Sequence, residues 1–366
     1  MPATASRPLR AHFRPPRPSP GLLPRVLSPL VADLGIDPGT ANTVVYAQGR
    51  GIVVQEPSVV AIGADRRRVV AVGRAAQRMI GRTPRDITTI RPVRGGAVAD
   101  FEVTHTMLRC FLRAAHSLRG WPRPRLVMAV PAGATSVERR AVRDAVLRAG
   151  ARAAVLVDEP LAAAIGAGLP VEEPAGCMVV AIGGGTTEVA VTSMGGVVAH
   201  TSVRVAGDDM DEAIMDHVRW RHGLIIGQPT AEALKIELGA MRPCAGDRTS
   251  LHGRDMVTGL PREMEITAAE VREAISGPLE QILTAVEMTL SVTPPELAAD
   301  VMDRGILLTG GLAQLPGLDV VISERTSVAA VLAEQPQLAV ARGVGRLVEE
   351  RALAGRLLHP RRAAWS

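Results

Sequence analysis

Residues 179–191 read VVAIGGGTTEVAV, an apolar run that enters three consecutive glycines and two threonines and continues as an alternating segment. Glycine has no Cβ, so such a turn can bend tightly and expose its backbone N–H groups, which is how a polypeptide wraps an oligophosphate. An ordinary β-hairpin gives the same pattern. One copy of this stretch therefore leaves both interpretations open.

A second copy, LGIDPGTANTVVY, lies at residues 34–46. With a constant offset of 144 residues, Asp37 aligns with Ala181 and Gly39 aligns with Gly183. Both copies read as strand, polar turn and strand. Two such units, separated by the length of a domain, predict a duplicated fold with one ligand between its halves.

Composition limits the possible classes. The chain has 366 residues, 47% hydrophobic and 22% charged, which is typical of a globular protein of about two domains. It contains no run of 18 apolar residues, so we expect no membrane-spanning helix. Cys110, Cys177 and Cys244 are widely separated and lack metal-ligand spacing, which favours a reducing compartment.

The net charge of +5 comes from the N-terminus. Five of the 42 basic residues lie in the first 30 positions, which carry no acid, so the remaining 37 balance the 37 acidic residues. Only 2% of the residues are aromatic, which leaves no platform for stacking bases and argues against a nucleic-acid partner. We expect residues 1–30 to be a disordered basic tail, either solvated or drawn to anionic lipid. Trp121, which lies between arginines, suits a membrane interface or a position folded back on the core.

Strand-like and helix-like segments alternate along the chain, which predicts α/β layers. We expect helices over residues 103–119, 136–149, 230–239 and 267–291, with Ser136 and Thr230 as N-caps, and a loop-rich segment over 241–262. A third strand-to-glycine turn, at 306–313, is another candidate phosphate or nucleotide contact.

With these turns in this order, the chain resembles the actin-like ATPase superfamily and, within it, the bacterial MreB/Mbl proteins. The motifs that carry the resemblance are LGIDPGTANT at 34–43, DEPLAAAIG at 158–166, IGGGTTEV at 182–189, RVAGDDMDEAI at 204–214, GRDMVTGLP at 253–261 and TPPELAAD at 293–300. The resemblance extends from about residue 33 to 350.

The resemblance implies an α/β, actin-like ATPase fold, in which two duplicated ribonuclease-H-like domains flank a nucleotide cleft. It places domain I at 31–170, with an insert at about 52–97 and a closing segment at 335–352. Domain II follows at 171–334, with an insert at about 212–265. Residues 353–366 are expected to be a C-terminal tail.

The resemblance also implies a site for ATP and Mg²⁺. Glu159 and Thr186 would position the attacking water, and Asp37 would hold the metal. By position alone, Glu159 could equally be an acid favoured beside a helix N-terminus. The implied cofactor contacts are Asp37, Gly39, Thr40, Ala41, Asn42, Gly183, Gly184, Gly185, Thr186, Gly207, Glu232, Ala233, Leu234, Lys235, Glu237, Gly310, Gly311, Leu312 and Ala313.

Lys235 is the one lysine of the sequence, among 42 basic residues. A flexible ammonium and a planar guanidinium are not interchangeable in a crowded pocket. This singularity favours a specific role for Lys235 near the nucleoside, although an ordinary solvated helix face or chance survival of one lysine gives the same residues.

The sequence departs from the family pattern at three positions. Ala181 stands where the family has Asp, and Asp37 remains in the first repeat. Mg²⁺ keeps several waters bound to carboxylates, so the loss of one acid should weaken hydrolysis more than nucleotide binding. Pro38 replaces a typical Leu and stiffens the turn, while Leu312 replaces a glycine and is expected to crowd the base or shift the backbone.

The function implied is that of a cytoplasmic, actin-like protein that forms filaments on the inner face of the plasma membrane and directs the cell-wall elongation machinery, with slow ATP hydrolysis. One alternative is a filament scaffold or regulator that binds nucleotide without turning it over. The other is an Hsp70-like or kinase-like ATPase on the same fold. A chaperone would need a further substrate-binding domain, and a kinase would need a substrate pocket with a base.

Overall fold

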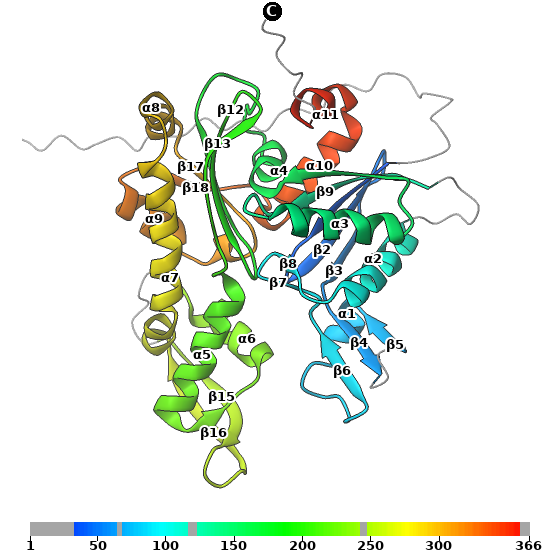
Figure 1. Cartoon of the computed structure of the whole chain (residues 1–366). Coiled ribbons are helices and arrows are strands. Elements are labelled where there is room, and N and C mark those ends of the chain that lie inside the picture. The colour runs from blue at the N-terminus through cyan, green and yellow to red at the C-terminus, as the bar shows by residue number, and fades with distance from the viewer. Residues whose placement is uncertain (1–32, 64–67, 116–122, 242–246, 359–366) are drawn as a thin grey trace, which may run out of the picture.

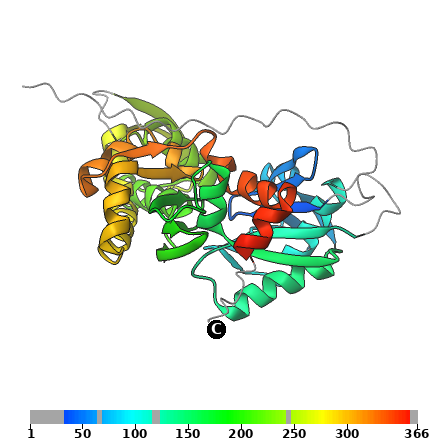
Figure 2. The same ribbon diagram turned by 90° about the horizontal axis from the view of Figure 1, so that it is seen from above.

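The computed structural model describes residues 33–63, 68–115, 123–241 and 247–358. These residues form two halves, each built on a five-stranded mixed sheet with helices packed against it (Figure 1). Viewed from above, the halves lie side by side, with the C-terminal helices near their junction (Figure 2).

The two sheets have the same plan. In the first, the order is β10-β9-β1-β2-β3, and in the second it is β13-β12-β11-β17-β18. In each, the central strand pairs antiparallel with its hairpin partner and parallel with the strand on its other side. The strands of the first sheet are β1 Leu34–Pro38, β2 Asn42–Ala47, β3 Gly51–Pro57, β9 Arg125–Val130 and β10 Ala153–Asp158. Those of the second are β11 Cys177–Ile182, β12 Thr187–Ser193, β13 Gly196–Val203, β17 Ile306–Thr309 and β18 Ala330–Leu332.

The register of the hairpins supports the predicted duplication. Asp37 pairs with Val44 in the first hairpin, and Ala181 pairs with Glu188 in the second. These partners differ by the same 144 positions that relate the two sequence motifs. The sequence repeat is therefore a repeat of structure.

Helices cover the sheets and connect the halves. The first half contributes α2 Phe101–Ala115, α3 Ser136–Arg148 and α4 Glu159–Gly166, and α10 Ala339–Glu349 and α11 Arg351–Leu358 return to it. The second half contributes α5 Gly207–His222, α6 Gln228–Leu238, α7 Ala268–Ser291, α8 Pro295–Arg304 and α9 Leu318–Thr326, with short 3-10 turns η1 Leu312–Gln314 and η2 Pro336–Leu338. Within the described residues, every helix is too short or too polar to cross a bilayer.

Each half carries a small appended sheet at its lower end in Figure 1. The first consists of β4 Val60–Gly63, β5 Val69–Val72 and β6 Ile87–Ile90, beside the short helix α1 Arg74–Gln77 and the ribbon of β7 Val93–Arg94 and β8 Ala97–Val98. The second consists of β14 Leu224–Ile225, β15 Arg248–Asp255 and β16 Pro261–Thr267. These sheets lie within the two predicted inserts, whose limits stay a prediction.

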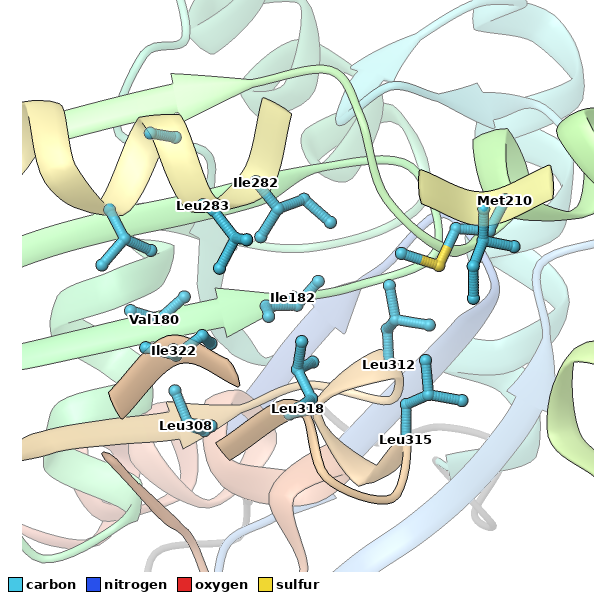
Figure 3. Close-up of a cluster of buried hydrophobic side chains, with 14 of the residues drawn as sticks. Val180, Ile182, Met210, Ile282, Leu283, Leu308, Leu312, Leu315, Leu318 and Ile322 are labelled. Carbon is cyan, nitrogen blue, oxygen red and sulfur yellow. The ribbon is translucent and has the colours of Figure 1, made fainter. Parts of the chain in front are cut away.

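The apolar core is divided among the halves and their junction. One buried cluster fills the second half and includes Ile182, Leu308 and Leu318 (Figure 3). A second joins α4 and α10 to both sheets, and a third lies in the first half. In the second cluster, the closely packed helices α4 and α10 lie at the connection between the halves.

Three local predictions were wrong. Thr135, not Ser136, caps α3, because Thr135 and Glu138 form a capping box in which the Glu138 N–H donates to Thr135 Oγ1 at 3.2 Å. Helix α6 begins at Gln228 after Gly227, which places Thr230 inside it. The segment 241–262, expected to be loop-rich, contains β15 and the start of β16. The side chains there are mostly polar, and Leu251 is the buried apolar residue of β15, so the segment lacks a clear strand pattern.

The C-terminal segment also differs from the expected tail. Residues 353–358 continue in α11, where Leu353 and Ala354 are buried. Arg356 forms an ion pair with Glu172 at 2.6 Å, which ties this helix to the segment before β11. Burial of one apolar edge explains why so short a helix forms here.

Candidate functional site

A cavity between the two halves is lined by all three glycine turns. Most of the residues predicted to contact the cofactor contribute to its walls. These are Asp37, Gly39, Thr40, Ala41, Asn42, Gly183, Gly184, Thr186, Gly207, Glu232, Lys235, Gly310, Gly311 and Leu312, together with the predicted catalytic Glu159. Residues as far apart in sequence as Asp37 and Leu312, which are separated by 275 positions, thus converge on one site.

The glycines of the second hairpin meet the first half closely. A Cβ on Gly184 would lie 2.9 Å from Ala41 Cβ, and one on Gly185 would lie 2.9 Å from the Gly95 nitrogen and from Thr40. The turn itself is closed by the Gly183 N–H, which donates to the Thr186 carbonyl at 2.9 Å. The absence of side chains therefore allows the two turns to approach each other across the cleft.

The third turn depends on a left-handed glycine. Gly310 has φ +89°, and a Cβ there would lie 2.2 Å from the Ile182 carbonyl oxygen. Gly311, in contrast, faces open space. Gly310 thus fixes this turn against β11 and leaves the next backbone unit exposed to the cavity.

Leu312, which was expected to crowd a bound base, also packs inward. It is 7% exposed and belongs to the second-half core while contributing to the cavity wall (Figure 3). Crowding of a base by this side chain stays a prediction.

The other predicted contacts lie away from the cavity. Ala233 and Glu237 are exposed on α6, and Leu234 and Ala313 are buried in the second-half core. Gly185 lies at the contact between the two hairpin turns and does not line the cavity. Helical periodicity explains the α6 pattern: Glu232, Lys235 and Ile236 are three or four residues apart and lie on the cavity face, and Ala233 and Glu237 do not.

Two carboxylates that line the cavity have strongly perturbed proton affinities. Burial raises the pKa of Asp37 to about 7. Burial, followed by the charges of Asp37 and Glu188, raises the pKa of Glu159 well above its usual range. Among the described residues, no basic side chain forms an ion pair with either group. Uncompensated acids of this kind are typical of functional sites and of cation sites.

Glu188 is a site residue to which the sequence analysis assigned no role. It is fully buried, accepts from Ser202 Oγ at 2.5 Å, and accepts from the Ala132 N–H of the first half at 3.2 Å. Burial raises the pKa of its carboxyl, against the effect of these two hydrogen bonds. The signal was present, because a glutamate in the alternating strand 187–193 places a charge in a buried layer.

The Lys235 side chain is buried and surrounded by polar groups. Its Nζ donates to the Gly207 carbonyl at 2.8 Å and lies 2.6 Å from Asp211 Oδ1, although this close ion pair is not in hydrogen-bonding geometry. Burial raises the pKa of Asp211 to about 6, and the ammonium opposes that rise. Asp208, which also lines the cavity, forms an ion pair with Arg91 of the first half at 3.4 Å. The roles of Asp208 and Asp211 could not be predicted from the sequence.

The cavity continues beyond the glycine turns into an apolar recess, which the sequence analysis also missed. Its walls come from α2, β9 and α3 of the first half and include Leu108, Met128 and Val142. No motif marks this recess, because its residues belong to the ordinary apolar faces of three separate elements.

The residues present fit one divalent cation beside a polyphosphate. Asp37 supplies a carboxylate at the point where the two hairpin turns meet, and the mutual repulsion of Asp37, Glu159 and Glu188 would be relieved by a cation. Ala181 lines the same cavity and offers no ligand atom. Position 181 of the second half therefore supplies no carboxylate to such a cation, whereas the equivalent position 37 of the first half does.

Some predictions concern residues outside the described part of the chain. The basic tail of residues 1–30, Trp121 and Cys244 lie there.

The chain matches the family model described as MreB/Mbl protein over residues 31–355. It is 50% identical over 327 residues to the cell shape-determining protein MreB of Escherichia coli K12, which covers 87% of this chain and 93% of that protein. It is 44% identical over 318 residues to the cell shape-determining protein Mbl of Bacillus subtilis, which covers 87% of this chain and 96% of that protein.

Solved structures give the same result. The crystal structure of MreB5 of Spiroplasma citri bound to AMPPNP has a TM-score of 0.84 and 31% identity, covering 90% of this chain and 99% of that chain. A MamK double helical filament has a TM-score of 0.73 and 22% identity, which supports the fold. These matches confirm the predicted fold class and the predicted family. The chain therefore belongs to the MreB/Mbl family of cell shape-determining proteins and has the actin-like fold of two duplicated α/β domains around a cleft.

Proposed function

We propose that this protein binds ATP in the cleft between its domains and assembles into filaments that take part in determining cell shape. The convergence of the three glycine turns on one cavity that also holds Asp37 and Glu159 carries the proposal. The AMPPNP-bound and ADP-bound MreB5 structures support it, because they show that a relative of the same fold binds adenine nucleotides.

In this proposal, each half holds one side of the triphosphate. Backbone N–H groups of the turns at Thr40–Asn42 and Gly184–Thr186 face the phosphates, Gly183 closes the second turn, and Gly310 and Gly311 form the adenosine side. Asp37 would hold Mg²⁺, which neutralises charge on the phosphates when bound. Glu159 and Thr186 orient the attacking water, and the raised pKa of Glu159 suits it to accept a proton.

We expect slow hydrolysis because Ala181 leaves the second-half side of the metal without a carboxylate. The Ala181→Asp variant should release phosphate about 10- to 100-fold faster, the range typical of groups that support metal ligands. Phosphate release from purified protein in Mg·ATP measures this effect. Asp37→Ala is the matched variant, and it should lose the remaining release.

Equal rates for the parent and Ala181→Asp proteins, with ATP affinity intact in both, would contradict this role for position 181. A parent protein that binds ATP and polymerises without any phosphate release would instead support the second candidate, a non-hydrolysing filament scaffold. The specific observation that favours that candidate is the missing ligand atom at Ala181.

Self-association, the membrane surface and the cell-wall elongation machinery are the proposed partners. MamK, a relative by fold, is described as a double helical filament. Arginines 7, 10, 14, 17 and 25 would bind anionic lipid at about 1 kcal/mol each when close to the surface. We therefore propose that the filaments lie on the inner face of the plasma membrane.

Liposome co-sedimentation tests the membrane proposal. Deletion of residues 1–30 should reduce binding to anionic vesicles, and the loss should be greater at low salt because exposed charges are screened at high salt. Trp121→Ala tests the second proposed contact. Unchanged binding of both variants would exclude these segments as membrane contacts.

A further inference from the structure

Two histidines and a glutamate meet at the packed ends of α5 and α7, in the second half (Figure 1). His217 and His222 lie on the last turns of α5, and Glu270 lies in the first turn of α7. None of the three lines the nucleotide cavity. The cluster is thus independent of the proposed ATP site.

The three side chains are close enough to share one ion. One ring nitrogen of each histidine and a carboxylate oxygen of Glu270 all lie within 4.8 Å of one another. His222 Nε2 is 2.8 Å from Glu270 Oε1. His217 Nε2 is buried and has no hydrogen-bond partner among the described residues, which is a costly state for an imidazole nitrogen.

The carboxylate of Glu270 is held in place by the helix cap. Its Oε2 accepts from the Thr267 N–H at 3.0 Å and from Thr267 Oγ1 at 2.8 Å. Its Oε1 is left to face His222. Ligating carboxylates in metal sites are commonly oriented in this way by hydrogen bonds on their second oxygen.

We propose that His217, His222 and Glu270 form a binding site for a Zn²⁺-class transition-metal ion. Two imidazoles and one carboxylate suit Zn²⁺, whereas Mg²⁺ and Ca²⁺ prefer oxygen ligands alone. In a tetrahedral zinc site the ligand atoms are roughly 3.3 Å apart, so the His222–Glu270 contact needs to widen by about half an ångström. Water fills the fourth position, on the side of the surface hollow beside Trp220 and Glu273.

Two arginines lie beside the cluster: Arg221, and Arg262, whose Nη2 donates to the His222 carbonyl while its Nη1 pairs with Asp255 at 2.7 Å. The Arg221 guanidinium lies 4.0 Å from Glu270 Oε1 and 3.6 Å from Glu273 Oε1, and its side chain is 56% exposed. It can therefore turn toward Glu273 when a cation binds at Glu270. Once bound, the ion joins the C-terminus of α5 to the N-terminus of α7 and stabilises the folded state of the second half by linkage.

Titration of the metal-free, tag-free full chain with ZnCl₂, followed by calorimetry, tests the site. We expect one Zn²⁺ per chain and at least about tenfold weaker binding in Glu270→Gln and in His217→Gln. Glutamine at position 270 can keep the capping box, so lost binding in that variant does not reflect lost folding. His252→Gln is the matched control, because His252 pairs with Glu263 at 3.7 Å on an exposed strand, and no described residue offers that pair a third ligand.

Co²⁺ gives a second readout, since a site with two imidazoles and a carboxylate should give it a visible absorption band that Glu270→Gln removes. The proposal is overturned if the parent binds no Zn²⁺, or if the affinities of Glu270→Gln and His217→Gln equal that of His252→Gln.

Discussion

At the scale of one residue, the buried carboxylate of Asp37 destabilises the folded protein when it is ionised. Burial raises its pKa from 3.8 to about 7, so the folded state holds this proton more tightly than the unfolded state does. The contribution of Asp37 to stability therefore falls as pH rises from about 4 to about 7, opposite to a salt-bridged aspartate. In the proposed function, a bound cation would offset the charge of this buried acid.

The Asp37→Asn variant should accordingly be more stable than the parent at pH 7.5 without nucleotide or Mg²⁺. We expect about 1–3 kcal/mol, reduced from the full shift because the cleft admits water. Near pH 4 the difference should vanish, since the parent is then protonated. Urea unfolding between pH 4 and pH 8 measures it.

Addition of Mg·ATP should reverse the order, because only the parent gains from a cation at this carboxylate. Equal pH slopes for the two proteins, or a less stable variant at pH 7.5, would show that burial does not perturb Asp37 in this way.

Single residues also mark how far sequence reasoning reaches into the site. Asp37 and Glu159 could be predicted because they lie in motifs with a known pattern. Asp211 and Glu188 were not assigned a role. A glutamate in an apolar strand marked position 188, but nothing in the sequence named its partners Ser202 and Ala132, or Lys235 as the partner of Asp211. Such pairings arise only from tertiary packing.

At the scale of elements, the crossing of α4 and α10 connects the halves. A Cβ on Gly166 would lie 1.8 Å from the Ala339 carbonyl oxygen, and one on Gly343 would lie 1.8 Å from the Ala162 carbonyl oxygen. Backbone thus meets backbone without side chains between. The geometry of this crossing sets how the two walls of the cleft face each other.

Gly343→Ala should therefore destabilise the protein by about 3 kcal/mol or more, because backbone atoms cannot move aside as a flexible side chain can. It should also weaken ATP binding by separating the two helices. Thermal unfolding and nucleotide titration measure the two effects.

Gly355→Ala in α11 provides the matched control. A Cβ at this exposed helical position meets nothing within 4 Å, so the change should stabilise by about 0.5–1 kcal/mol. A Gly343→Ala protein as stable as the parent would mean that the helices separate at no cost.

Elements with strong periodicity or a marked turn were predicted correctly, and weakly patterned ones were not. The strand–turn–strand unit at 179–191 and the helix expected over 267–291, which is α7, have clear apolar periods. Strands β15 and β16 carry polar residues on both faces and show no apolar alternation, so they form strands because they pair with each other. Sequence patterns predict burial, and strands that bury little leave few signals.

At the scale of the whole molecule, ion pairs connect the halves across the cleft. Arg91 pairs with Asp208 at 3.4 Å, and Arg204 pairs with Glu138 at 3.1 Å. The Arg91 side chain is only 15% exposed, so its pair is the better shielded from solvent. Because Asp208 also lines the cavity, this pair links the closed arrangement of the halves to the ligand site.

Arg91→Gln should favour a more open cleft and weaken nucleotide-dependent assembly. If filaments require the closed arrangement, the critical concentration in Mg·ATP should rise about two- to fivefold, the equivalent of a partly exposed ion pair. Sedimentation over a range of protein concentrations measures this value.

Arg325→Gln is the control for lost surface charge, because Arg325 pairs with Glu287 and Glu280 within the second half and spans no cleft. Its critical concentration should match that of the parent. An equal rise in the critical concentration of both variants would mean that the effect comes from net charge. An unchanged critical concentration in Arg91→Gln would mean that assembly does not depend on this ion pair across the cleft. Added salt should narrow the gap between the parent and Arg91→Gln, since screening weakens the same pair that the substitution removes.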